Sequence, residues 1–76
     1  MKTLKNIVKT LISENYEVKP IGSSYYVYDK GKREFEIGID IYDRFYLVST
    51  DEENTLHFDD EKQLIDTIFF VWHCKN

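Results

Sequence analysis

Apolar and polar residues alternate along the middle of the chain. Phe35, Ile37, Ile39 and Ile41 are apolar, and the positions between and before them are Glu34, Glu36, Gly38 and Asp40. Successive side chains of a β-strand leave opposite faces, so this period of two predicts a strand over residues 33–41. We expect one face of that strand to meet a core and the other to present carboxylates.

A helical pattern precedes this strand. Its apolar positions recur at spacings of three and four, namely Leu4, Ile7, Val8, Leu11 and Ile12. This stripe predicts an amphipathic helix. We expect Asn15 to end the helix in the left-handed conformation, with Tyr16 packing back on the last turn.

The segment between helix and central strand predicts a hairpin. Residues 17–21 predict a short strand. Pro20 lacks an N–H group to pair with a neighbour, which favours an edge position for this strand. Residues 25–28 predict a second strand of good β-formers. The next four residues, 29–32, read as a tight loop in which Gly31 takes positive φ.

The loop length decides which side chains face the core. A three-residue loop with a bulge places Tyr25 and Val27 on the core face with Phe35, and leaves Tyr26 and Tyr28 on the open face beside Glu34 and Glu36. A two-residue loop reverses the two faces. We favour the first interpretation because it buries Val27.

The second half of the chain predicts one further strand and a closing helix. A turn at residues 42–43 leads into a strand over 44–50, whose register is open because residues 45–48 are all apolar or aromatic. Residues 49–55 form an acidic loop, and residues 56–58 either add a brief strand or cover the core.

The closing helix is expected to begin at Asp59 or Asp60, since an aspartate cap suits the positive end of a helix. Its apolar face comprises Leu64, Ile65, Ile68, Phe69, Val71 and Trp72, and Phe70 points the other way. The predicted architecture is a single α+β domain over residues 1–76: an N-terminal helix, an antiparallel meander of three or four strands, and a C-terminal helix, with both helices on one face of the sheet.

Charge divides the chain into two parts. Residues 1–28 carry four Lys against two Glu, whereas residues 29–66 carry twelve acids against five bases, and the whole chain has a net charge of −4. This balance argues against direct binding to nucleic acid, which needs clustered Lys and Arg. An acidic segment imitates the phosphate field of DNA, docks on a basic partner, or simply solvates a small domain.

The sequence predicts a cytoplasmic protein. Cys74 is the single cysteine, so no internal disulfide forms. The first residues lead directly into the amphipathic pattern without the apolar run of a signal peptide, and the longest apolar run, 68–72, is too short for a membrane span.

Neither a metal site nor a catalytic site is predicted. His57, His73 and Cys74 lack the spacing of zinc ligands. Glu34 and Glu36 are paired carboxylates, but acid–base work needs a pocket that separates their pKa values. We therefore expect no cofactor, no metal and no reaction; a pocket that enclosed His57 with a carboxylate would favour an enzyme instead.

The remaining candidate is a recognition surface for a basic protein partner. Tyrosines supply rigid contact area and acids steer association, so we expect the partner-binding residues to be Tyr26, Tyr28, Glu34, Glu36, Asp40, Asp51, Glu52, Glu53 and Phe70. The alternative is a homodimeric module that joins through Phe70, the last helix or a sheet edge.

Two resemblances accompany these patterns. The order helix, strands, helix resembles the double-stranded-RNA-binding domain, although Asp59, Asp60, Glu61 and Lys62 stand where that family has phosphate-binding lysines. The segments SENYEVKPIG (13–22) and YLVSTDEEN (46–54), with residues 7–9, resemble a family of small prophage-encoded anti-CRISPR proteins that inhibit the type II-A CRISPR nuclease.

The second resemblance covers about half of the chain and implies a function. Members of that family are acidic, carry a helix, a three-stranded sheet and C-terminal helices, and imitate DNA where the nuclease reads its protospacer-adjacent motif. Asn15 stands where the family has a contacting acid, and the hairpin tip 30–33 is basic where the family's is acidic and amide-rich. The resemblance implies a non-enzymatic DNA-mimic inhibitor from a phage or mobile element.

Overall fold

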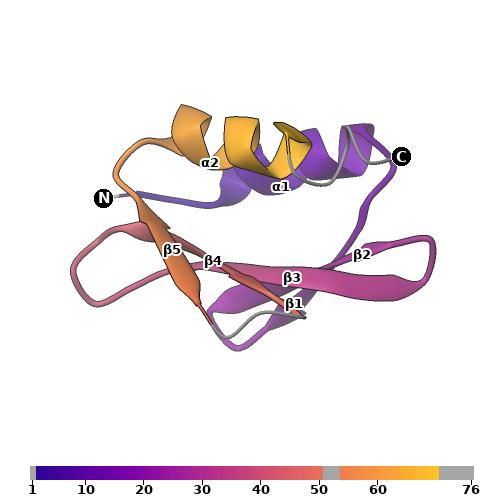
Figure 1. Cartoon of the computed structure of the whole chain (residues 1–76), viewed down its shortest axis with the longest axis horizontal. Helices are drawn as coiled ribbons and strands as arrows, with labels where there is room; N and C mark the ends of the chain where they lie inside the picture. Colours follow the sequence, from indigo (N-terminus) through magenta and orange to yellow (C-terminus); the bar gives the residue numbers. More distant parts are fainter. Residues whose placement is uncertain (1, 51–53, 71–76) are drawn as a thin grey trace.

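The computed structural model has two layers, a five-stranded sheet and a pair of helices that lie over one of its faces (Figure 1). It describes residues 2–50 and 54–70. The elements in chain order are α1 (Lys5–Ser13), β1 (Glu17–Ile21), β2 (Ser24–Asp29), β3 (Lys32–Ile39), β4 (Phe45–Ser49), β5 (Thr55–Phe58) and α2 (Glu61–Ile68). Each strand pairs antiparallel with the next one in sequence. The predicted α+β meander between two helices is confirmed, with five strands instead of three or four.

Helix α1 covers the sheet through the predicted stripe. Ile7 and Leu11 are buried, but Ile12 is 55% exposed, so the stripe ends one position earlier than expected. Asn15 takes the predicted left-handed conformation with φ of 71°. The N–H of Tyr16 donates to the carbonyl of Leu11 at 3.0 Å, which closes the helix and turns the Tyr16 ring into the core.

The β2–β3 hairpin buries the predicted face by a different route. Its turn has two residues, Lys30 and Gly31, both at positive φ, which is the geometry that matches the twist of the strands. The register then shifts by one, so that Glu34 is an extra residue and Val27 lies opposite Phe35. The prediction that Val27 lies on the core face with Phe35 is confirmed, whereas the predicted three-residue loop is wrong. The bulge at Glu34, not the length of the loop, brings Val27 and Phe35 to the same face of the sheet.

Strand β3 ends two residues before the predicted boundary. Ile41 was expected on the core face, yet it is 90% exposed. The reason is Asp40, whose carboxylate accepts hydrogen bonds from the backbone N–H groups of Tyr42 and Arg44 and so forms a turn where the alternation predicts a strand. In β4, Phe45 and Leu47 face the helices, which settles the register that the sequence left open.

The core lies between the two layers and, among residues 2–50 and 54–70, is entirely apolar apart from one tyrosine hydroxyl. It comprises Leu4, Ile7, Leu11, Tyr16, Val27, Phe35, Ile37, Phe45, Leu47, Leu64 and Ile68. Helix α2 begins as predicted, because Asp60 is its N-cap and accepts from the N–H of Lys62 at 3.0 Å. The expected core positions 71 and 72 and the acidic loop residues 51–53 lie outside the described residues. Within the described part of the chain, neither helix has the length and apolarity needed to cross a bilayer.

Candidate interaction surfaces

The sheet face turned away from the helices carries aromatic side chains and charges of both signs. Strand pairing places Lys19, Tyr26, Glu36 and Val48 in one row across four strands. The ammonium of Lys19 lies 4.8 Å from the ring centre of Tyr28 on this face. This open face is therefore of mixed charge rather than uniformly acidic.

Tyr46 links three strands of the open face. Gly38 lies directly opposite Tyr46, and a β-carbon at Gly38 would overlap the Tyr46 ring. The ring reaches across β3, where its hydroxyl donates to Glu36 Oε2 at 2.7 Å and shares a hydrogen bond of 2.5 Å with Ser24 Oγ. Burial raises the pKa of the Tyr46 phenol, the Ser24 hydrogen bond lowers it, and Glu36 adds to the increase, so that the pKa lies above its usual value. Gly38 is thus explained by the close approach of this ring.

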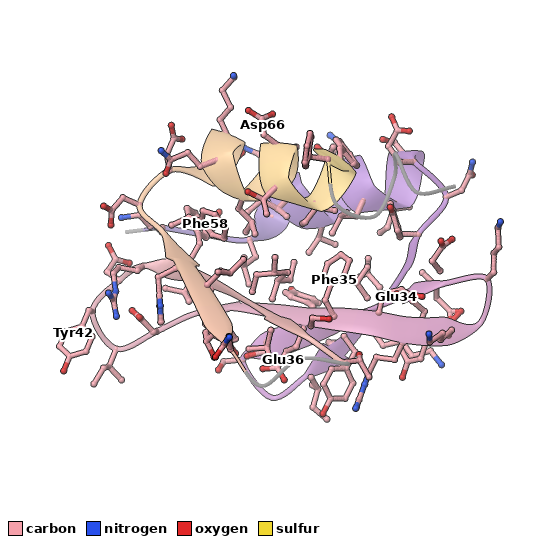
Figure 2. The ribbon with its side chains drawn as sticks, viewed as in Figure 1. Glu34, Phe35, Glu36, Tyr42, Phe58 and Asp66 are labelled. Carbon is pink, nitrogen blue, oxygen red and sulfur yellow. The ribbon has the colours of Figure 1, made fainter. Side chains whose placement is uncertain are left out.

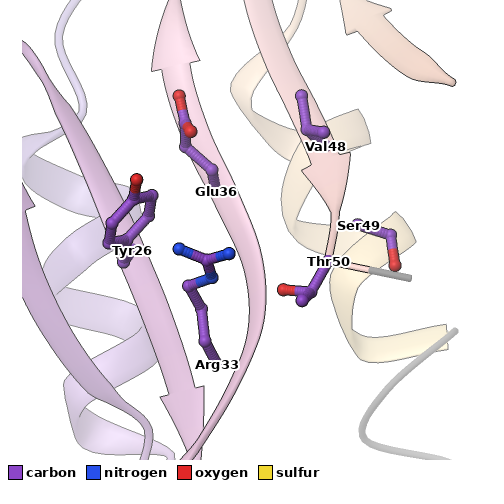
Figure 3. Close-up of a pocket in the computed structure, with 6 residues that line it drawn as sticks. All are labelled: Tyr26, Arg33, Glu36, Val48, Ser49 and Thr50. Atoms are coloured by element: carbon purple, nitrogen blue, oxygen red, sulfur yellow. The ribbon is translucent and has the colours of Figure 1, made fainter. Parts of the chain in front are cut away.

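A shallow groove lies beside this link. Its volume is about 210 Å³, and its walls are Tyr26, Arg33, Glu36, Val48, Ser49 and Thr50 (Figure 3). The guanidinium carbon of Arg33 lies 4.5 Å from the ring centre of Tyr26, a cation–π contact. Among residues 2–50 and 54–70, neither Arg33 nor Glu36 has an ion-pair partner. The groove thus holds a cation and an anion that are both available.

Asp40 organises the β3–β4 turn. Its Oδ1 accepts from the backbone N–H groups of Tyr42 at 2.9 Å and Arg44 at 3.0 Å, and its Oδ2 pairs with the Arg44 guanidinium at 2.8 Å. Burial alone would raise the pKa of Asp40. The hydrogen bonds from Arg44 and Tyr42 outweigh burial, and the Arg44 charge adds to them, so the pKa lies below its usual value.

The turn that Asp40 holds presents two apolar side chains to solvent. Ile41 is 90% exposed and Tyr42 is 71% exposed. Figure 2 shows Tyr42 projecting away from the body of the domain. The Arg44 guanidinium carbon lies 5.2 Å from the centre of the Tyr42 ring, within the range of a cation–π contact. We call Ile41 and Tyr42 the turn tip.

Carboxylates lie at the same end of the sheet as the turn tip. Phe58, the last residue of β5, pairs with Phe45, the first residue of β4, so the corner that follows β5 lies beside the β3–β4 turn (Figure 1). That corner carries three acids in succession, Asp59, Asp60 and Glu61. Asp59 and Glu61 form no ion pair with any residue that the structure describes.

The structure divides the carboxylates that the sequence placed on one face. Glu36 lies on the open face, whereas Glu34, at the bulge, lies on the helix side of β3 (Figure 2). The pKa of the Tyr16 phenol is raised by burial and also by the nearby charges of Asp29 and Glu34, which agrees with this placement. Asp40 is neutralised by Arg44.

The other predicted contact residues are also separated. Tyr26 and Tyr28 lie on the open face as expected, with the cations of Arg33 and Lys19 over their rings. Phe70 is 78% exposed but follows α2, in the helical layer. Asp51, Glu52 and Glu53 lie outside the described residues.

The turn tip was not predicted from the sequence. The alternation of apolar residues assigned Ile41 to the core and placed Tyr42 in an ordinary turn. Asp40 was the residue that could have indicated this turn, because an aspartate carboxylate readily accepts hydrogen bonds from backbone N–H groups that follow it and so favours a turn over a strand. In the structure it accepts from the N–H groups of Tyr42 and Arg44.

His57 lies beside a carboxylate, the combination that would favour an enzyme. Its Nε2 is 3.5 Å from Asp40 Oδ2, but that oxygen already binds Arg44, and the His57 side chain is 38% exposed and does not line the groove. The described residues contain no group of three or more His, Cys, Asp or Glu side chains that would hold a metal ion. His73 and Cys74 lie outside them.

Comparison with protein-family models, with curated proteins and with solved structures finds no match for this chain.

Proposed function

We propose that this chain is a small, acidic, non-catalytic interaction protein that binds a basic protein surface. The observation that carries the proposal is the turn tip: Ile41 and Tyr42 are exposed, yet the turn beneath them is fixed by the hydrogen bonds and ion pair of Asp40. A preorganised aromatic anchor loses little conformational freedom on binding, which is the property of residues that dominate binding energy at interfaces.

Acids that are unpaired in the described part of the chain lie at the same end of the sheet as the turn tip and support a basic partner, since the cations there, Arg44 and Lys2, are already paired with Asp40 and Asp43. Asp59 and Glu61 lie at the same end of the sheet without an ion-pair partner among the described residues, and the chain has a net charge of −4. Acids around an apolar anchor accelerate encounter with a basic surface and reject acidic ones. The anchor supplies affinity, and the acids supply selectivity.

The class of partner is a protein that binds nucleic acid. Such proteins carry basic surfaces, because they neutralise phosphates with Lys and Arg. The resemblance of residues 13–22 and 46–54 to anti-CRISPR proteins supports an inhibitor of this type, encoded by a phage or mobile element and acting as a DNA mimic. Its place of action in this proposal is the cytoplasm.

Affinity capture from a lysate of the host cell tests the proposal. The immobilised wild-type chain is compared with Tyr42→Ser, Ile41→Ser and the matched control Ile12→Ser, which removes an exposed isoleucine from α1 in the other layer. We expect a protein that the wild type and the control retain in low salt, that high salt releases, and that each tip variant retains at least about tenfold less.

Purified DNA then competes with the captured chain. Release of the partner by the DNA it binds supports mimicry. If every captured protein is retained equally by the tip variants and the wild type, or if retention is insensitive to salt, the proposed function is wrong.

A further inference from the structure

The open face of the sheet has a feature that the turn tip does not explain. Arg33 and Glu36 line one groove, yet they do not pair with each other. Each is held by an uncharged neighbour, because Arg33 stacks on the Tyr26 ring and Glu36 accepts from the Tyr46 hydroxyl at 2.7 Å. Figure 3 shows the two side chains in the same groove, with Tyr26 beside them.

We infer that this groove is the contact surface for a second copy of the chain. In a dimer with two-fold symmetry, residue i of one copy meets residue j of the other, and j meets i. A surface with one available cation and one available anion is complementary to itself under that operation. Arg33 of each copy then pairs with Glu36 of the other.

The rest of the groove suits such a contact. Tyr26 and Val48 form its apolar walls, and Thr50 contributes a hydroxyl at its edge. Tyrosine and arginine are enriched, with tryptophan, among the residues that contribute most to binding at protein interfaces. Helices α1 and α2 lie on the opposite face of the sheet (Figure 1), so neither of them blocks the approach of a second sheet to this face.

This inference is independent of the proposed function, because the groove and the turn tip share no residue. It also differs in place from the dimer that the sequence suggested, which used Phe70, the last helix or a sheet edge. Phe70→Ser is therefore expected to leave the self-association unchanged.

Sedimentation of the purified full chain tests the inference. We expect the wild type to show a concentration-dependent dimer. Arg33→Glu and Glu36→Arg each place like charges opposite one another in the dimer, and each is expected to raise the dissociation constant by about tenfold or more. The matched controls are Lys9→Glu and Glu14→Arg, which make the same charge changes at exposed positions of α1 and its C-cap.

Mixing the two groove variants gives the decisive result. Arg33→Glu and Glu36→Arg are each weakened alone, but together they restore both opposite-charge contacts, so an equimolar mixture is expected to dimerise. The double variant, which exchanges the two charges within one chain, is expected to dimerise as well. Circular dichroism confirms that each variant is folded. If Glu36→Arg does not fold, the test uses Glu36→Gln, which keeps an acceptor for Tyr46 but removes the charge; we then expect Arg33→Glu and Glu36→Gln each to weaken the dimer, and a dimer that neither change weakens overturns the inference.

A wild-type chain that stays monomeric at millimolar concentration overturns the inference. A dimer that neither charge reversal weakens overturns it too, because the contact then lies elsewhere on the molecule. If the reversals weaken the dimer but the mixture fails to restore it, Arg33 and Glu36 do not meet across the two-fold axis, and the inference is again rejected.

Discussion

Replacing Gly38 by alanine tests the link that Tyr46 makes across the open face. A β-carbon at position 38 would overlap the far end of the Tyr46 ring, which must then move away from Glu36 and Ser24. Each lost neutral hydrogen bond costs about 0.5–1.5 kcal/mol, and one to a charged group costs about 1.5–3 kcal/mol. Alanine regains roughly 0.5–1 kcal/mol because glycine loses more backbone freedom on folding. With both hydrogen bonds lost, we expect Gly38→Ala to lower the free energy of unfolding by about 1–4 kcal/mol.

The sign of this effect should depend on Tyr46. In a Tyr46→Ala background there is no ring to displace, so the same Gly38→Ala change is expected to be neutral or to stabilise by up to about 1 kcal/mol. Urea denaturation of the four proteins, followed by circular dichroism, gives the coupling energy directly. If Gly38→Ala lowered the free energy of unfolding equally in both backgrounds, the explanation would be refuted, because the effect of the added β-carbon would then not depend on the Tyr46 ring.

Three further results are expected. Asp40 has a pKa below its usual value of 3.8, so it stabilises the fold above that pH and loses this contribution as the pH falls through its folded-state pKa. The difference in unfolding free energy between the wild type and Asp40→Asn, measured by urea titration, should therefore decrease on acidification. A difference that does not change with pH would contradict this. Tyr46 has a pKa above its usual value of 10.0, so its contribution to the stability of the fold is complete below that pH and is lost as the pH rises through its folded-state pKa. Ultraviolet absorbance of the phenolate should show ionisation at a higher pH in the folded wild type than in the urea-unfolded chain. Titration curves that coincide would contradict this. Phe35 is fully buried at the centre of the core, so Phe35→Ala should cost about 3–5 kcal/mol and leave a domain of this size largely unfolded by circular dichroism; a cooperative transition close to that of the wild type would show that the core is described wrongly.

The sequence predicted the layers of the fold because periodicity reports burial. The stripe of α1 and the alternation around Phe35 each identify one buried face, and both faces meet in the core. The strand over residues 17–21 was predicted, but the number of strands was less accessible, since β5 is a short edge strand whose exposed residues give little alternation.

The candidate surfaces were harder to predict, because they depend on register. The bulge at Glu34 moves one carboxylate of the expected acidic face to the helix side, and no local pattern in the sequence announces it. The groove depends on the same shift, which brings Arg33 and Glu36 to one side of β3. The position of Gly38 opposite Tyr46 was likewise visible only after β4 had been aligned with β3.

The most direct test of the proposed function is the affinity of the chain for the captured partner, measured at low and physiological salt. We expect the dissociation constant to rise steeply with salt. Relative to the wild type, it should rise at least about tenfold in Tyr42→Ser and stay unchanged in Ile12→Ser. The variant Phe70→Ser shows in the same assay whether Phe70, which follows α2, contributes. An affinity that is the same for the wild type and Tyr42→Ser at both salt concentrations would contradict the claim that this turn binds a basic protein.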